Sequence, residues 1–238
     1  MKLFENLDVS GVEKTEDYVG GFSNLLESDI YVMKIKTAYA TTSKGGAMGV
    51  TFVGDINGNE YSETLYITNK NKEPYYIDAQ RKKRFIPGYN VVNNICLVAA
   101  GKGITDLETE DKILNVYSFE EKKRVPTSVP VLVDLSGKDV ALGIVKELSN
   151  KSVADGKGGY VPTAETRESN ITVAVFYPDT HKSVNEQAEG KDATFWDKWL
   201  EKNQGKTVDR RKFKEGNSPS LTPVSAPTPQ PRKSLFEK

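Results

Sequence analysis

The sequence has few of the residues on which metal sites and many enzyme sites depend. Among 238 residues there is one cysteine, Cys96, and one histidine, His181. A single cysteine excludes an internal disulfide, and these two residues are too few for a zinc site built from Cys and His. His181 follows the turn-prone stretch FYPDT, which favours a surface position over a catalytic base. We therefore expect no metal, no other cofactor and no catalysis.

Long apolar runs are also absent. No stretch approaches the roughly 20 apolar residues that a membrane-spanning helix requires. No apolar segment of the signal-peptide kind follows Met1. Together with the single cysteine, this pattern predicts a soluble protein of a reducing, intracellular compartment. Apolar residues make up 37% of the chain, which is ordinary for a globular protein with a core.

Neither sign of charge is in excess overall, because 33 Lys and Arg balance 33 Asp and Glu. The distribution along the chain is uneven. The segment 204–238 holds eight basic and three acidic residues, so the rest of the chain carries a negative excess. An acidic body has to build any anion-binding surface from local clusters of cations. The run from Arg81 to Arg84 is one such cluster.

Apolar and polar residues alternate in several runs, which is typical of strands. Between the first three runs stand SKGG and NGN, whose Gly and Asn residues accept positive φ and favour hairpins. The segment 1–29 lacks this alternation, and we interpret it as an irregular N-terminal arm. Strands are predicted at about 30–41, 47–56, 60–68, 113–119, 129–134, 139–148 and 171–177.

Two segments have helical spacing instead. In NVVNNICLVAAGKG, Asn90 is the predicted N-cap and Gly101 the predicted C-cap. The second segment, DATFWDKWLEKNQG, places two tryptophans on one face of a short helix. Its predicted N-cap is Asp192 or Thr194, and Gly205 ends it.

A three-strand meander followed by a helix and further strands is the order of elements in an OB-fold. Because the chain has more than five predicted strands, we expect a mainly β, elaborated OB-fold barrel, with a helix between the third and fourth strands and a C-terminal helix. A plain β-sandwich is the competing architecture. The predicted domain covers residues 1–203, including the N-terminal arm. Residues 204–238 are rich in Pro, Ser and basic residues and predict a disordered tail.

The strongest functional signal is NKEPYYIDAQRKKRF, residues 71–85. Binding single-stranded nucleic acid without sequence preference requires rings on which bases stack and cations that follow the phosphates. This stretch holds both, and aromatic residues on the first three predicted strands extend the same surface of an OB-fold. The candidate nucleic-acid-binding residues are Tyr39, Phe52, Tyr66, Lys70, Lys72, Tyr75, Tyr76, Arg81, Lys82, Lys83, Arg84, Phe85 and Tyr89.

Each candidate has an alternative interpretation. Alternation without a known register makes a core position about as favourable as a groove position for Phe52 and Tyr66. For the run from Arg81 to Arg84, the alternative is a solvated loop.

Several segments spread along the chain carry a family resemblance. They are MKLFENL, EYSETLYITN, VVNNICLVAAGK, VYSFEEKKRVPTSVPVLVDLSGKDVALGIVK, GGYVPTAETR, FWDKWLEKNQGKT and the closing KSLF. In this order they resemble the single-stranded DNA-binding proteins encoded by tailed bacteriophages, from residue 1 to residue 236. The resemblance implies an OB-fold that coats single-stranded DNA in the host cytoplasm during phage replication, recombination and repair, without catalysis.

The resemblance also implies a C-terminal tail that recruits phage or host replication and recombination proteins. In that family the better-known tail is an acidic run that ends in an aromatic residue. Here the tail is basic and ends in KSLFEK, so Leu235 and Phe236 are the candidate partner-binding residues. The competing hypothesis is a protein-interaction module that acts through this tail and the tryptophan helix, with no nucleic acid in the groove. Whether the nucleic acid is DNA or RNA stays open, because stacking and phosphate contacts alone do not read the 2′-hydroxyl.

Overall fold

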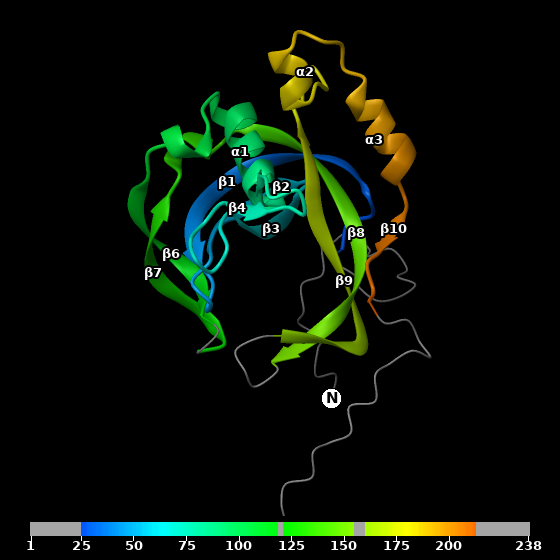
Figure 1. Cartoon of the computed structure of the whole chain (residues 1–238). Helices are drawn as coiled ribbons and strands as arrows, with labels where there is room; N and C mark the ends of the chain where they lie inside the picture. The colour runs from blue at the N-terminus through cyan, green and yellow to red at the C-terminus, as the bar shows by residue number, and fades with distance from the viewer. Residues whose placement is uncertain (1–24, 119–120, 155–159, 213–238) are drawn as a thin grey trace, which may run out of the picture.

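The computed structural model describes residues 25–118, 121–154 and 160–212 (Figure 1). Most of the predicted N-terminal arm, and the tail with Leu235 and Phe236, lie outside these residues. In the described part of the chain the structure is mainly β, as predicted. None of its helices is long and apolar enough to cross a membrane.

Eight of the strands belong to one sheet. The predicted meander is confirmed, because each of its strands pairs antiparallel with the next. The strands of this sheet are β1 (Asp29–Thr42), β2 (Met48–Ile56), β3 (Asn59–Tyr66), β6 (Glu110–Ser118), β7 (Lys123–Val131), β8 (Asp139–Ala154), β9 (Tyr160–Phe176) and β10 (Thr207–Asp209). A separate two-stranded sheet consists of β4 (Tyr75–Ile77) and β5 (Lys83–Phe85).

The long strand β1 organises the main sheet. One edge of β1 pairs with β2, and the other pairs with β8 over residues 29–34 and with β7 at Tyr39. β9 then pairs with β8. In Figure 1 the β6–β7 hairpin lies at the left and the β8–β9 hairpin at the right, with β3 and β4 between them.

The sheet is open and does not close into a barrel, so the predicted OB-fold barrel is not confirmed. Backbone pairing runs from β9 through β8, β1 and β2 to β3, and no ladder joins β3 to β9 among the described residues. The two edges are instead bridged by side chains. Thr172 on β9 donates from its N–H and its hydroxyl to the carboxylate of Glu63 on β3. Alternation predicts strands, but it does not say whether the last strand returns close enough to pair with the third.

Helix α1 (Pro87–Ala100) packs on the inner face of the sheet, where it forms the main core. Val92, Ile95 and Cys96 on this helix are buried against sheet residues that include Met33 and Phe52. The helix begins at Pro87 with Ile86 as its N-cap, not at the predicted Asn90, because proline is well suited to the first helical turn. The predicted C-cap is confirmed, since Gly101 has φ 68°. Burial raises the pKa of Cys96 to about 12, which fits a packing role.

The opposite face of β8 and β9 is covered by α3 (Phe195–Asn203), which follows the short helix α2 (Val184–Ala188). Trp199 is buried against Gly143, where a Cβ atom would lie 2.9 Å from the indole Cε2. Trp196 stacks on His181 with ring centroids 4.1 Å apart. The lone histidine and both tryptophans therefore contribute to packing.

Residues 204–212 differ from the predicted disordered tail. After α3 the chain forms β10, which pairs in parallel with residues 146–148 of β8. The N–H of Lys212 then donates to the side chain of Asn150. Apolar spacing alone did not reveal this strand, because only Val208 in it is apolar. Two single turns of 3-10 helix, Ile104–Asp106 and Val133–Leu135, complete the described elements.

The contact between α1 and β3 gives a stability prediction. A Cβ atom at Gly88 would lie 2.1 Å from the carbonyl oxygen of Tyr66. Gly88→Ala should therefore lower the free energy of unfolding by about 1–3 kcal/mol, although helix propensity alone favours alanine by about 1 kcal/mol. Urea unfolding measures the change. Gly45→Ala is the control, because its nearest atom, Ser43 Oγ, is 3.9 Å away; it should stay within about 0.5 kcal/mol of the wild type. A stabilised Gly88→Ala protein would contradict the close approach.

Candidate nucleic-acid interface

The β4–β5 hairpin is held by its own polar side chains. Asp78 stands at the start of the turn, and its carboxylate accepts hydrogen bonds from the N–H groups of Gln80 and Lys82. Arg84 Nε donates to the same carboxylate at 2.9 Å. The Lys82 N–H, followed by the Arg84 guanidinium, lowers the pKa of Asp78. Arg81 occupies the turn with φ 59°. The basic run is thus part of a structured hairpin, and its four side chains remain exposed to solvent.

The rings of this hairpin differ in what they contact. Tyr75 is half-buried, and Lys83 Nζ lies 4.2 Å from the centre of its ring. Phe85 stacks on Tyr89 with ring centroids 4.5 Å apart, yet it keeps 53% of its surface exposed. Tyr76 is 49% exposed. Tyr76 and one face of Phe85 are therefore available to a ligand, whereas Tyr75 already holds a cation.

Tyr66 ends β3 on the outer face of the sheet, opposite to the face that packs against α1. Its register partner is Gly49 on β2, where a Cβ atom would lie 3.0 Å from Tyr66 Cδ1. The glycine thus lets the ring lie close over the sheet, and 44% of the tyrosine remains exposed. Tyr39 lies on the same outer face, half-buried beside Thr51.

A groove of about 810 Å³ connects these rings with β9 and α1. We call it the β3–β9 groove. It occupies the region where β3 and β9 are not joined by a backbone ladder. Its lining residues are Glu63, Thr64, Leu65, Tyr66, Tyr76, Phe85, Pro87, Gly88, Asn90, Val91, Asn94, Glu147, Arg167, Ser169, Asn170, Ile171, Thr172, Val173, Ala174, Val175 and Arg210.

The structure brings only part of the predicted set together. Tyr66, Tyr76 and Phe85 line the groove. Phe52 is 2% exposed in the core, so its predicted role in binding is wrong. Alternation fits both faces of β2, and the position of α1 decides which face is the core. The other candidates do not line the groove; they are Tyr39, Lys70, Lys72, Tyr75, Arg81, Lys82, Lys83, Arg84 and Tyr89.

Several lining residues were not predicted from the sequence. Arg167 comes from β9, and Arg210 follows β10. Asn90 and Asn94 come from the exposed side of α1. Arg167 and Arg210 share no local motif with the hairpin, because distant segments of the chain supply them. The pairing of β9 and of β10 with β8 brings them to the groove.

Charges in the groove are largely balanced. Arg210 Nε lies 3.0 Å from a carboxylate oxygen of Glu147. Arg167 Nε donates to Ser149 Oγ at 3.5 Å, a long and weak contact. Among the described residues, Arg167 has no carboxylate partner. It is therefore the cation of the groove that is best placed to meet an anionic ligand.

Glu63 is a half-buried polar residue that lines the groove. Oε1 accepts the Thr172 N–H at 3.0 Å, and Oε2 accepts the hydroxyls of Thr172 at 2.5 Å and Tyr61 at 3.0 Å. Burial raises the pKa of Glu63, although these hydrogen bonds oppose the shift. Burial, followed by the nearby Glu63 charge, also raises the pKa of Tyr61. The cluster is thus a structural bridge whose donors and acceptors are already engaged.

The comparisons with known proteins assign no family. No protein-family model matches the chain, and a search of the curated proteins finds no similar sequence. The described residues contain no group of three or more His, Cys, Asp or Glu side chains suited to a metal ion. The function therefore has to be argued from the groove itself.

The Glu63 bridge gives a prediction about pH. A carboxyl whose pKa is raised by folding binds its proton more tightly in the folded state. Its contribution to stability is therefore largest below the ordinary carboxyl pKa of about 4.3 and falls as pH rises through the raised value. Glu63→Gln has no titrating carboxyl at this position and so lacks this pH-dependent contribution. When pH is raised from about 4 to about 7.5, the free energy of unfolding of the wild type should therefore fall relative to that of Glu63→Gln. Urea unfolding at both pH values measures the difference.

Glu63→Ala serves as the companion variant. It leaves the Thr172 N–H without its acceptor, which should cost about 1–3 kcal/mol at either pH. A stability difference between wild type and Glu63→Gln that is the same at both pH values would contradict the raised pKa.

Proposed function

We propose that this protein binds single-stranded DNA without sequence preference and without catalysis, as the phage single-stranded DNA-binding proteins do in replication, recombination and repair. One observation carries the proposal. Three exposed rings, those of Tyr66, Tyr76 and Phe85, line one groove together with Arg167 and Arg210. Rings for stacking beside cations for phosphates are what nonspecific single-strand binding requires.

The strand order supports an OB-type architecture for this proposal. OB-folds are partly open, five-stranded barrels. Here β1, β2 and β3 form the meander, α1 follows, β8 returns to pair with β1, and β9 pairs with β8. We propose that these five strands form the OB element, that the β6–β7 hairpin is an insertion, and that the Glu63 bridge stands where a closing ladder would run.

Stacking is the main source of affinity in the proposed mechanism. Every base has a π-face, so a flat exposed ring accepts any of the four bases. Tyr66 is supported by the sheet beneath it at Gly49, and Phe85 is supported by Tyr89. Rings held in this way lose little conformational freedom when a base stacks on them.

Contacts between cations and phosphates supply the rest of the proposed affinity for the single strand. Arg167 reaches the strand within the groove, and Arg81 and Lys82 extend positive charge along the hairpin turn. Among the described residues, the side chains of Arg81 and Lys82 have no ion-pair partner. Lys83 and Arg84 are instead engaged with Tyr75 and Asp78.

The proposal predicts the effect of removing each ring. Tyr66→Ala, Tyr76→Ala and Phe85→Ala should each weaken binding of a labelled dT oligomer by about 1–3 kcal/mol, that is about 5- to 150-fold, with little change in salt dependence. Ile77→Ala is the matched control, because Ile77 is exposed on the same hairpin but does not line the groove. Fluorescence anisotropy measures the affinities, with duplex DNA and RNA as competitors. Wild-type affinity in a variant that lacks all three rings would rule out the groove.

Replacing the cations should instead change how strongly the affinity depends on salt concentration. Each phosphate contact on a single strand contributes about 0.7 to the slope of log K against log salt concentration. Arg167→Gln should lower that slope by about 0.7, and the Arg81→Gln, Lys82→Gln double variant by up to twice as much. Lys138→Gln, exposed in the turn before β8, should leave the slope unchanged. If Arg167→Gln also leaves it unchanged, Arg167 does not meet a phosphate.

A further inference from the structure

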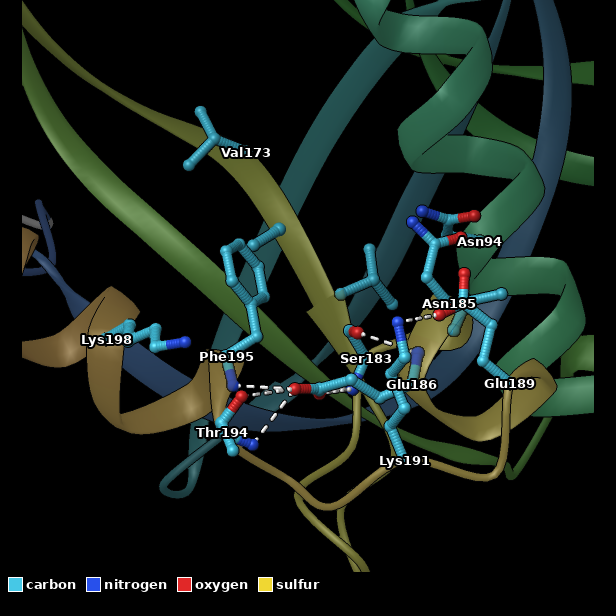
Figure 2. Close-up of a pocket in the computed structure, with 13 residues that line it drawn as sticks. Asn94, Val173, Ser183, Asn185, Glu186, Glu189, Lys191, Thr194, Phe195 and Lys198 are labelled. Carbon is cyan, nitrogen blue, oxygen red and sulfur yellow. Dashed lines mark hydrogen bonds and ion pairs between the residues drawn. The ribbon is translucent and has the colours of Figure 1, made fainter.

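The β3–β9 groove continues beyond the rings already described. A second hollow of about 440 Å³ lies between α1, β9 and the segment that joins α2 to α3 (Figure 2). It shares Asn94, Val173, Ala174 and Val175 with the β3–β9 groove. The two hollows therefore form one continuous path along β9. We call the second one the α3 hollow.

The α3 hollow holds an exposed ring in a fixed position. Phe195 is 44% exposed, while its ring centre lies 5.6 Å from that of the buried Phe176. Its N–H donates at 2.8 Å to Glu186 Oε1, which also accepts the N–H of Thr194. Figure 2 shows Glu186 reaching toward this loop below the ring.

Glu186 keeps this loop in place by a capping box. Its other oxygen, Oε2, accepts the N–H of Ser183, and Ser183 Oγ accepts the N–H of Glu186. Burial opposes ionisation of Glu186, but the N–H groups of Ser183, Phe195 and Thr194 lower its pKa to about 2. The carboxylate is therefore ionised and fully engaged at neutral pH. Phe195 is thus presented on a rigid support, as a stacking platform has to be.

A cation stands beside the ring. Lys198 lines the α3 hollow three residues after Phe195, and among the described residues its ammonium group has no ion-pair partner. The other lysine of this hollow, Lys191, is paired with Glu189. On the opposite wall, Asn94 and Asn185 offer both donors and acceptors, which suit the edge of any base (Figure 2).

We infer that the α3 hollow is a second base-stacking subsite, in which a single strand that leaves the β3–β9 groove along Val173 stacks a base on Phe195 and sets a phosphate against Lys198. This inference rests on the proposed function. Three observations support it: the two hollows share lining residues, the exposed ring of Phe195 is held in place, and Lys198 has no ion-pair partner among the described residues. It predicts a longer footprint than the hairpin and β3 alone provide.

The test compares affinity with the length of the oligonucleotide. Wild type, Phe195→Leu, Lys198→Gln and the control Lys202→Gln are titrated with labelled dT oligomers of about 4 to 30 nucleotides, which bracket the ~4–16 nucleotides that one OB-fold occupies. Lys202 is exposed one turn further along α3 and does not line the hollow. Phe195→Leu keeps an apolar side chain against Phe176, and Lys198→Gln changes only an exposed side chain.

Short oligomers should bind all four proteins equally. Long oligomers should bind Phe195→Leu at least about 5-fold more weakly, and Lys198→Gln should lower the salt slope by about 0.7 for long oligomers only. Both variants should reach their full affinity at a shorter length than wild type, and Lys202→Gln should match wild type.

Three outcomes would overturn the inference. If wild type binds but both variants match it at every length, the subsite does not exist and the proposed function still stands. If the variants lose affinity equally at all lengths, the residues do not form a separate subsite. If wild type binds no single strand even at low salt, the proposed function fails, and the subsite fails with it.

Discussion

The carboxylate of Glu63 joins the two edges of the sheet, and the groove exists because they are joined in this way. A backbone ladder would hold β3 and β9 about 4.8 Å apart and leave no opening between them. A glutamate side chain spans a wider gap and still satisfies the Thr172 N–H at the edge of β9. Tyr66 on β3 and Arg167 on β9 therefore line the opening between the two strands.

The hairpin at the entrance of the groove divides its residues between structure and surface. Asp78 and Arg84 hold the turn, and Lys83 covers the ring of Tyr75. Engaging these groups internally fixes the hairpin, so that Tyr76 and Phe85 stand exposed on a defined scaffold. The same principle recurs at the far end of β9, where the buried Glu186 supports the exposed Phe195. In both places a carboxylate that accepts backbone N–H groups positions a ring beside it.

The elements of the fold were largely predictable, because strand and helix periodicities depend on neighbouring residues. The meander, the helix that ends at Gly101 and the helix with both tryptophans all appear close to their predicted positions. The faces of the strands were not predictable. Phe52 and Tyr66 have the same alternation around them, yet one is in the core and the other on the surface, because α1 covers only one face of the sheet. The strand β10 was missed because its stability comes from pairing with β8 and not from apolar content.

The sequence by itself determined that this protein has only one cysteine and one histidine, that the chain is mainly β, and that the stretch 71–85 is rich in rings and cations. These features are set by residue types and by contacts within a few positions of each other. Only the tertiary structure decided that the sheet stays open, that Glu63 meets Thr172 across it, and that Arg167 and Phe195 lie along the same path as Tyr66. Glu63 and Thr172 are 109 positions apart in the chain. They meet only because β8 pairs with β1 and β9 then pairs with β8.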